Sequence, residues 1–162
     1  MDRFTISNLE LINSKFPGGK SVLDIIDKTS TPMGSRLIRR WLCFPSIDLS
    51  EIKFRHDIVE ELVKLSSTSL LEKYNSIIDI ERIISKITNY KVNPRELINL
   101  KLSLFEVGEI KKELNSKSKN LKQLSKKFKR SNQVIQLIEK NLFDESPVNI
   151  NKGNTIKIGI NK

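Results

Sequence analysis

The stretch TPMGSRLIRRWLCFP, residues 31–45, contains the signals for both ends of one helix. Thr31 can accept a hydrogen bond from an amide of the first helical turn, and Pro32 suits the first helical position, where no amide donor is needed. Pro45 cannot continue a helix, and it disfavours helical backbone at the residue before it. The stretch therefore predicts a helix of about three turns.

This helix also has an apolar stripe. Its large apolar side chains are spaced by four, four and three residues, at Met33, Leu37, Trp41 and Phe44. Such spacing places them on one side of a helix, with the arginines elsewhere, so we expect that side to pack against a core.

Further helices are expected before and after this stretch. Polar capping residues precede runs of helically spaced apolar side chains, as where Asp48 and Glu51 predict a capping box and where Asn93 precedes Pro94. After an extended start, the expected helices are a turn around Leu9 and residues 21–28, 31–44, 48–63, 70–74, 79–88, 93–114, 121–128 and 131–143. The sequence thus predicts an all-α fold, a multihelical bundle.

The pattern changes beyond Pro147. Apolar residues there alternate with polar ones on either side of a Gly-Asn turn, at Val148, Ile150, Ile156 and Ile158. Alternation of this kind predicts two short extended segments that pair as a hairpin. We therefore expect a helical domain over residues 1–143 and an extended segment over residues 144–162.

The sequence predicts no catalytic, cofactor-binding or metal site. Gly18-Gly19-Lys20-Ser21 ends like a phosphate-binding P-loop, but Ser14 stands where that motif needs glycine, and no apolar strand precedes it. A loop between helices is the simpler interpretation. His56, the one histidine, lies on an apolar helical stripe without partners at ligand spacing, so we expect a buried or interface residue. Cys43 is expected to be a small packed residue.

Asp79 and Arg82 resemble an acid–base pair but have an ordinary structural explanation. Asp79 can cap the helix that follows it and can pair with Arg82, one turn away. The isoleucines of that helix, Ile80, Ile83, Ile84 and Ile87, are then expected to bury its other face.

The chain is strongly basic, with 29 Lys and Arg against 19 Asp and Glu and a formal charge of +10. Residues 111–130 hold nine basic residues and one acid, Glu113, and are the best electrostatic candidate for contact with phosphates. The candidate DNA-phosphate contacts are Lys119, Lys122, Lys126 and Lys127. Phe128 is the one aromatic residue there, so the tract lacks a platform for stacking bases, and a solvated face is the alternative interpretation.

Several features favour a cytoplasmic protein that does not contact a membrane. Cys43 is the one cysteine, no Asn-x-Ser/Thr sequon is present, and charged Asp2 and Arg3 follow Met1 in place of an apolar signal region. Charges interrupt every hydrophobic run well before the length that a membrane span needs.

Several blocks of the sequence carry a family resemblance. They are DRFTISNLEL at 2–11, SVLDIIDKT at 21–29, the stretch at 31–45, DIERIISKI at 79–87, NPREL at 93–97, and INKG at 150–153 with IK at 156–157. In order and spacing these blocks resemble the core, or lever, region (domain III) of the MutS family of DNA mismatch-repair ATPases. The resemblance implies a fragment that follows the mismatch-reading and connector domains, stops where the clamp begins, and lacks the ATPase.

The resemblance also implies a mechanical role. Packed helices of this region would couple the ATPase to the DNA clamp, so the fragment itself would need no cofactor and would not be an enzyme. The parent protein would bind ATP and Mg²⁺, would bind double-stranded DNA with mismatches, and would be a homodimer. The residues expected to matter structurally are Pro32, Arg36, Arg40, Trp41, Glu81, Arg82, Pro94 and Arg95.

The sequence departs from the family pattern near its end. Asn154 stands where the family commonly has a second glycine, and Ile158 stands where a charged residue is frequent. These departures bear on the hairpin and on the connection to the clamp. A self-contained basic helical module that binds nucleic acid is the competing hypothesis. An enzyme is the third class, and it lacks support because no nucleophile with a base, metal cluster or phosphate loop is recognisable in the sequence.

Overall fold

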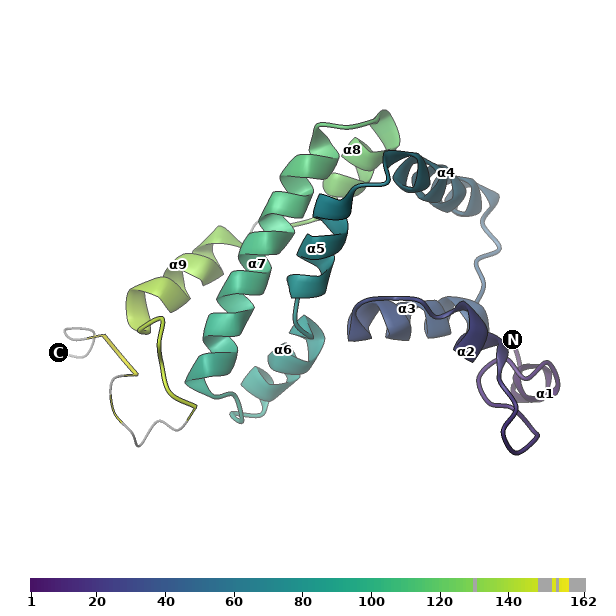
Figure 1. Ribbon diagram of the computed structural model, residues 1–162, viewed down its shortest axis with the longest axis horizontal. Helices are drawn as coiled ribbons and strands as arrows, with labels where there is room; N and C mark the ends of the chain where they lie inside the picture. Colours follow the sequence, from purple (N-terminus) through teal and green to yellow (C-terminus); the bar gives the residue numbers. More distant parts are fainter. Residues whose placement is uncertain (130, 149–152, 154, 158–162) are drawn as a thin grey trace. The chain divides into compact units, whose positions relative to one another are not determined.

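The computed structural model describes residues 1–129, 131–148, 153 and 155–157. Within these residues the chain is helical, and its β-structure is limited to one isolated bridge, so the predicted all-α class is confirmed. The helices are α1 (Arg3–Asn8), α2 (Val22–Ile26), α3 (Pro32–Cys43), α4 (Leu49–Leu65), α5 (Thr68–Ser76), α6 (Ile80–Thr88), α7 (Pro94–Asn115), α8 (Lys119–Ser125) and α9 (Asn132–Asn141) (Figure 1).

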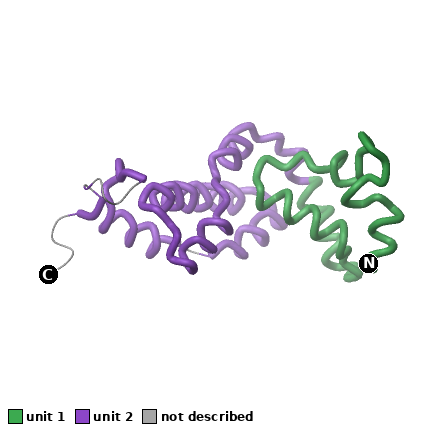
Figure 2. Tube along the Cα trace, turned by 90° about the horizontal axis from the view of Figure 1, so that it is seen from below, with its two compact units in different colours: residues 1–60 green, residues 61–162 purple. Residues whose placement is uncertain are grey.

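The chain divides into two compact units, residues 1–60 and residues 61–162, and the division falls inside α4 (Figure 2). The separate helical and extended domains expected on either side of residue 143 stay a prediction. Among the described helices, none combines the length and the apolar character that crossing a membrane would require.

Local polar caps define the helices of the first unit. The carboxylate of Asp2 accepts a hydrogen bond from the amide of Thr5 at 2.8 Å, so α1 begins at Arg3 and the expected extended start is wrong. Ser21 and Asp24 form a capping box at α2. Thr31 accepts a hydrogen bond from the amide of Gly34 at 3.1 Å, and the helix predicted from residues 31–45 is confirmed as α3.

The apolar stripe of α3 is not buried as expected. Leu37, Trp41 and Phe44 are 45%, 40% and 68% exposed, because this unit has few long helices to cover them and Leu11 is its one buried apolar side chain among the described residues. Trp41 lies instead against the guanidinium of Arg55 in α4, whose Cζ is 3.9 Å from the ring centroid. This cation–π contact connects α3 with α4.

The start of α4 differs in detail from the predicted capping box. Asp48 accepts hydrogen bonds from the amides of Ser50 at 2.8 Å and Glu51 at 3.4 Å, which caps the helix. The reciprocal bond is absent, because the amide of Asp48 donates to Ser46 while the carboxylate of Glu51 accepts from Ser46 and Arg55. His56 is exposed on α4, so the buried alternative is wrong for this chain, and an interface position stays a prediction.

The second unit is organised around α7, which packs against α5, α6, α8 and α9. Figure 1 shows α7 with α9 along one side and α5 and α6 along the other. The predicted start of α7 at Asn93 and Pro94 is confirmed, and the structure adds a capping box between Asn93 and Glu96. The sequence predicts an apolar stripe on this helix at Leu97, Leu100, Leu104, Val107, Ile110 and Leu114. Three of these residues, Leu100, Ile110 and Leu114, are buried, the other three are partly buried, and Ile98 is buried in addition.

The core of this unit reaches α6 and α9. Ile83 and Ile138 are buried against Ile98 and Leu100 of α7, with Ile80 packed beside them. The expectation for α6 is half right. Two of its isoleucines are covered, whereas the other two, Ile84 and Ile87, are exposed.

The chain end beyond α9 forms no hairpin of the predicted kind within the described residues. Ile156 makes an antiparallel bridge to Leu142, at the end of α9. The amide of Lys157 donates to the carbonyl of Asn141 at 2.9 Å. Ile156 therefore pairs with the end of α9 and not with a second extended segment among the described residues. Ile150, Asn154 and Ile158 lie outside the described residues.

Candidate nucleic-acid interface

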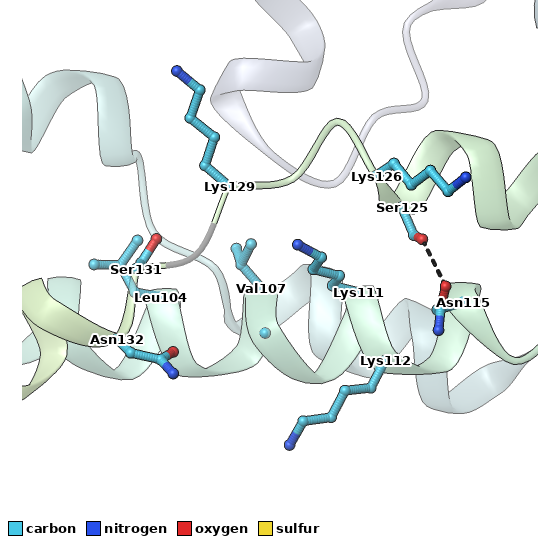
Figure 3. Close-up of a pocket in the computed structure, with 11 residues that line it drawn as sticks. Leu104, Val107, Lys111, Lys112, Asn115, Ser125, Lys126, Lys129, Ser131 and Asn132 are labelled. Atoms are coloured by element: carbon cyan, nitrogen blue, oxygen red, sulfur yellow. Dashed lines mark hydrogen bonds between the residues drawn. The ribbon is translucent and has the colours of Figure 1, made fainter.

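A groove of about 560 Å³ lies between α7 and the connecting segment that joins α8 to α9, here its described residues 126–129 and 131. Figure 3 shows α7 along one side of it and the connecting segment along the other. The helix contributes Leu104, Val107, Gly108, Lys111, Lys112 and Asn115. The opposite side is formed by Ser125, Lys126, Lys129, Ser131 and Asn132.

The lining is positively charged. It includes four lysines and, among the described residues, no carboxylate. Lys111 donates a hydrogen bond to the carbonyl of Phe128, which holds the connecting segment against α7. Lys112 pairs with Glu109 at 2.7 Å on the exposed surface of α7. In the described part of the chain, Lys126 and Lys129 form no ion pair with a carboxylate.

Hydrogen bonds fix both ends of α8 and so fix the start of the connecting segment. At the first end, Ser118 caps the helix and donates to the carboxylate of Glu61, which also accepts from Asn120 at 3.0 Å. At the other end, the buried hydroxyl of Ser125 donates to the carbonyl oxygen of Lys122 at 2.8 Å within α8 and lies 3.5 Å from Oδ1 of Asn115 on α7 (Figure 3). Lys126 follows directly, so its position depends on this anchored helix.

Glu113, the one acid in the basic tract, is held by partners on α5. Its carboxylate accepts hydrogen bonds from Lys73 at 2.7 Å and from Ser67 at 3.2 Å. The hydrogen bond from Lys73 lowers the pKa of Glu113 below its usual value, partial burial opposes this, and the Ser67 bond adds to the lowering. Glu113 is thus engaged with α5 and absent from the groove lining.

The structure separates the four lysines proposed from the sequence. Lys126 lines the groove, whereas Lys119 and Lys122 lie exposed on α8 and Lys127 lies exposed just beyond it. The other groove lysines, Lys111, Lys112 and Lys129, belong to the tract but were not singled out. No sequence signal selects them, since the groove exists only because the chain folds back along α7.

The residues expected to matter structurally occupy several helices and do not form one site. On α3, Pro32, Arg36 and Arg40 are exposed, and Trp41 contacts Arg55. Glu81 and Arg82 are exposed in the first turn of α6. At the start of α7, Pro94 is buried and Arg95 is exposed.

The sequence features that resemble reactive sites have structural roles. Ser21 is fully buried and caps α2, and its hydroxyl lies 2.7 Å from the carboxylate of Asp24. Asp79 accepts a hydrogen bond from the amide of Arg82 and caps α6, as predicted. Cys43 is a half-buried free thiol, and no group of metal-ligating side chains is present within the described residues.

Acidification is expected to destabilise the second unit through Glu96 and Glu113. Hydrogen bonds from Lys86 and from the amide of Asn93 lower the pKa of Glu96, and partial burial opposes this effect. The pKa of Glu113 is lowered as well, for the reasons given above. A lowered folded-state pKa stabilises the fold above the unfolded-state value, near 4.5 for glutamate, and this stabilisation disappears as the pH falls through the folded-state pKa. Denaturant unfolding measured across pH should therefore show a falling free energy of unfolding below about pH 4.5.

The Glu113→Gln variant tests this assignment. We expect it to be less stable than the parent chain at pH 7 and to show a flatter acid limb, so that the two curves converge at low pH. Glu72→Gln, at an exposed position on α5, is the matched control. Equal pH dependence of the Glu113→Gln and Glu72→Gln variants would contradict a stabilising role for the Lys73–Glu113 pair.

Comparison with known proteins identifies the family. The family model described as MutS domain III matches residues 4–158, which is almost the whole chain. The chain belongs to the MutS family. The resemblance of residues 2–11, 31–45 and 79–87 to the MutS core region is thereby confirmed.

Curated MutS proteins match over the full length of this chain. The chain is 41% identical to the DNA mismatch repair protein MutS of Flavobacterium johnsoniae, with 100% of the chain and 19% of the relative covered. It is 36% identical to that of Phocaeicola vulgatus, with 99% and 19% covered. It is 38% identical to that of Caldanaerobacter subterraneus, with 100% and 19% covered. The chain thus spans about one fifth of the length of these MutS relatives.

Proposed function

We propose that this chain is the domain III segment of a MutS protein of DNA mismatch repair, and that it transmits structural change between an ATPase and a DNA clamp elsewhere in that protein. The observation that carries the proposal is the match to MutS domain III over residues 4–158. The segment itself acts mechanically. ATP and Mg²⁺ belong to the longer protein, as do recognition of mismatched double-stranded DNA and assembly into a homodimer.

The construction of α7 supports a mechanical role. It has 22 residues, which corresponds to about 33 Å of continuous helix. Four helices pack along it, and ion pairs join it to its surroundings near both ends, at Lys86–Glu96 and at Lys73–Glu113. A helix held in this way moves as a unit, so a displacement at one end is carried to the other.

The proposal can be tested by softening α7 in the full-length protein. Leu102 and Phe105 are each 55% exposed on α7, so replacing both with glycine leaves the buried positions of the helix unchanged. It weakens the helix by about 1 kcal/mol per site relative to alanine. The measured quantity is the factor by which ATP changes the affinity for mismatched DNA. We expect the double glycine variant to reduce this factor, while affinity without nucleotide stays the same.

The matched control is the double alanine variant at Leu102 and Phe105. It loses the same side chains but keeps a strong helix former at each site, so its response to ATP should match that of the unmodified protein. An undiminished ATP response in the double glycine variant would overturn the transmission role of α7.

A further inference from the structure

We propose that the groove between α7 and the connecting segment binds the phosphate backbone of double-stranded DNA. The choice of DNA as the partner rests on the proposed repair function. The groove as an anion-binding site rests on its own residues, chiefly Lys126, Lys129 and Gly108.

Two of the groove lysines have no carboxylate partner among the described residues. Other lysines that contact or belong to α7 are neutralised by nearby carboxylates, as Lys101 is by Asp144 and Lys73 is by Glu113. Lys126 and Lys129 lack such a partner within the described residues, and Figure 3 shows both extending from the connecting segment. Two unpaired ammonium groups on one segment attract an external polyanion, and phosphates spaced along a DNA strand provide one.

The lining of the groove determines which kind of ligand the groove can recognise. Its described lining contains no aromatic side chain on which a base could stack. The lining residues carry ammonium, hydroxyl and amide groups that can donate hydrogen bonds to phosphate oxygens, on the lysines, Ser131 and Asn132. Figure 3 shows Lys129 extending from the connecting segment away from α7 and Lys126 extending along it, so a phosphate backbone would meet these two lysines along the connecting segment. The groove therefore suits a duplex backbone, which presents phosphates and keeps its bases stacked inside.

Gly108 lies in the middle of α7 and lines the groove. Glycine inside a helix makes the helix less stable than alanine does, by about 1 kcal/mol. A Cβ atom built at this position would meet nothing within 4 Å, so packing does not require the glycine. Its effect is to leave the groove open beside Val107 and Lys111, where a side chain would occupy the space.

The first experiment measures binding of the 162-residue chain to a short, fully paired, fluorescently labelled DNA duplex by anisotropy at several salt concentrations. We expect the Lys126→Gln, Lys129→Gln double variant to lose roughly tenfold to a hundredfold in affinity at about 50 mM salt. The slope of log affinity against log salt should also fall in magnitude by about 2, since about 0.9 counterions are released per phosphate contact.

The control removes two charges elsewhere in the same unit. Lys91→Gln with Lys140→Gln alters two exposed lysines that do not line the groove. We expect this variant to keep the salt slope of the parent chain. If both double variants lose the same affinity and the same slope, binding follows net charge alone and the groove proposal is wrong.

The second experiment blocks the groove without changing its charge. Gly108→Gln places a polar, helix-favouring side chain in the open space, so the fold should be at least as stable as before. We expect DNA affinity to fall by roughly tenfold or more, because the side chain displaces the bound phosphate. Gly108→Ala adds one methyl group and should bind nearly as the parent chain does. Wild-type affinity in the Gly108→Gln variant would overturn the proposal.

These outcomes are separable from those of the proposed function. The groove experiments use no nucleotide and no mismatch, whereas the α7 experiment measures the ATP response of the full-length protein with the groove intact. Loss of ATP coupling without an effect of Gly108→Gln would retain the mechanical function and exclude the groove. The opposite result would retain the groove and exclude the transmission role of α7.

Discussion

Replacing Leu114 with alanine is expected to lower the free energy of unfolding of the second unit by about 2 to 5 kcal/mol. The Leu114 residue is completely buried near the end of α7, and the neighbouring core positions Ile110 and Leu121 are 1% and 2% exposed. Removing three heavy atoms there loses their burial and leaves a cavity that surrounding helices fill only in part. Denaturant unfolding followed by circular dichroism measures the change.

Leu102→Ala is the matched control, since it makes the same side-chain change on the same helix at a position that is 55% exposed. Its effect should stay near 0.5 kcal/mol or below, as is usual for surface substitutions. If the two variants are destabilised equally, the arrangement of α7 with Leu114 facing the core is incorrect.

Replacing Ser103 with alanine is expected to lower the free energy of unfolding by about 1 to 3 kcal/mol. Ser103 is 1% exposed in the middle of α7, and its hydroxyl accepts a hydrogen bond from the amide of Ile78 at 3.1 Å. Ile78 lies in the turn between α5 and α6, so this bond fastens that turn to α7. Alanine leaves the partly buried amide of Ile78 without its acceptor, and a donor left unsatisfied there is more costly than a lost surface bond.

Two measurements check this prediction. Denaturant unfolding gives the stability change, and hydrogen exchange of the Ile78 amide should become faster in the variant as its protection is lost. Ser69→Ala, at an exposed position on α5, should change neither quantity appreciably. Unchanged exchange at Ile78 in the Ser103→Ala variant would show that the hydroxyl is not the acceptor on which this turn depends.

The helix starts were predictable because their signals are local. A capping oxygen acts on an amide two or three residues later, so Thr31, Ser21 and Asn93 could be recognised from a few neighbouring letters. Asp2 carries the same signal at α1, and it was missed because the helix that follows is only six residues long. The buried stripe of α7 was also predictable, since a long helix shows its period repeatedly.

The exposed stripe of α3 and the groove were not predictable in the same way. Periodicity shows that Leu37 and Trp41 share a side of the helix, but it does not show whether another element covers that side. Glu113 stands out in the sequence as the one acid of a basic tract, yet its partner Lys73 lies 40 residues earlier. Such pairings arise only when distant segments meet.

The arrangement around α7 has a consequence for how the second unit forms during synthesis. The helices that pack on it are the two that precede it in the chain and the two that follow it. Each docking event therefore closes a short loop, with a small loss of chain entropy. Because synthesis starts at the N-terminus, α5 and α6 are already made when α7 is completed. Low contact order of this kind is typical of helical proteins that fold in microseconds to milliseconds, before partly made chains have time to aggregate.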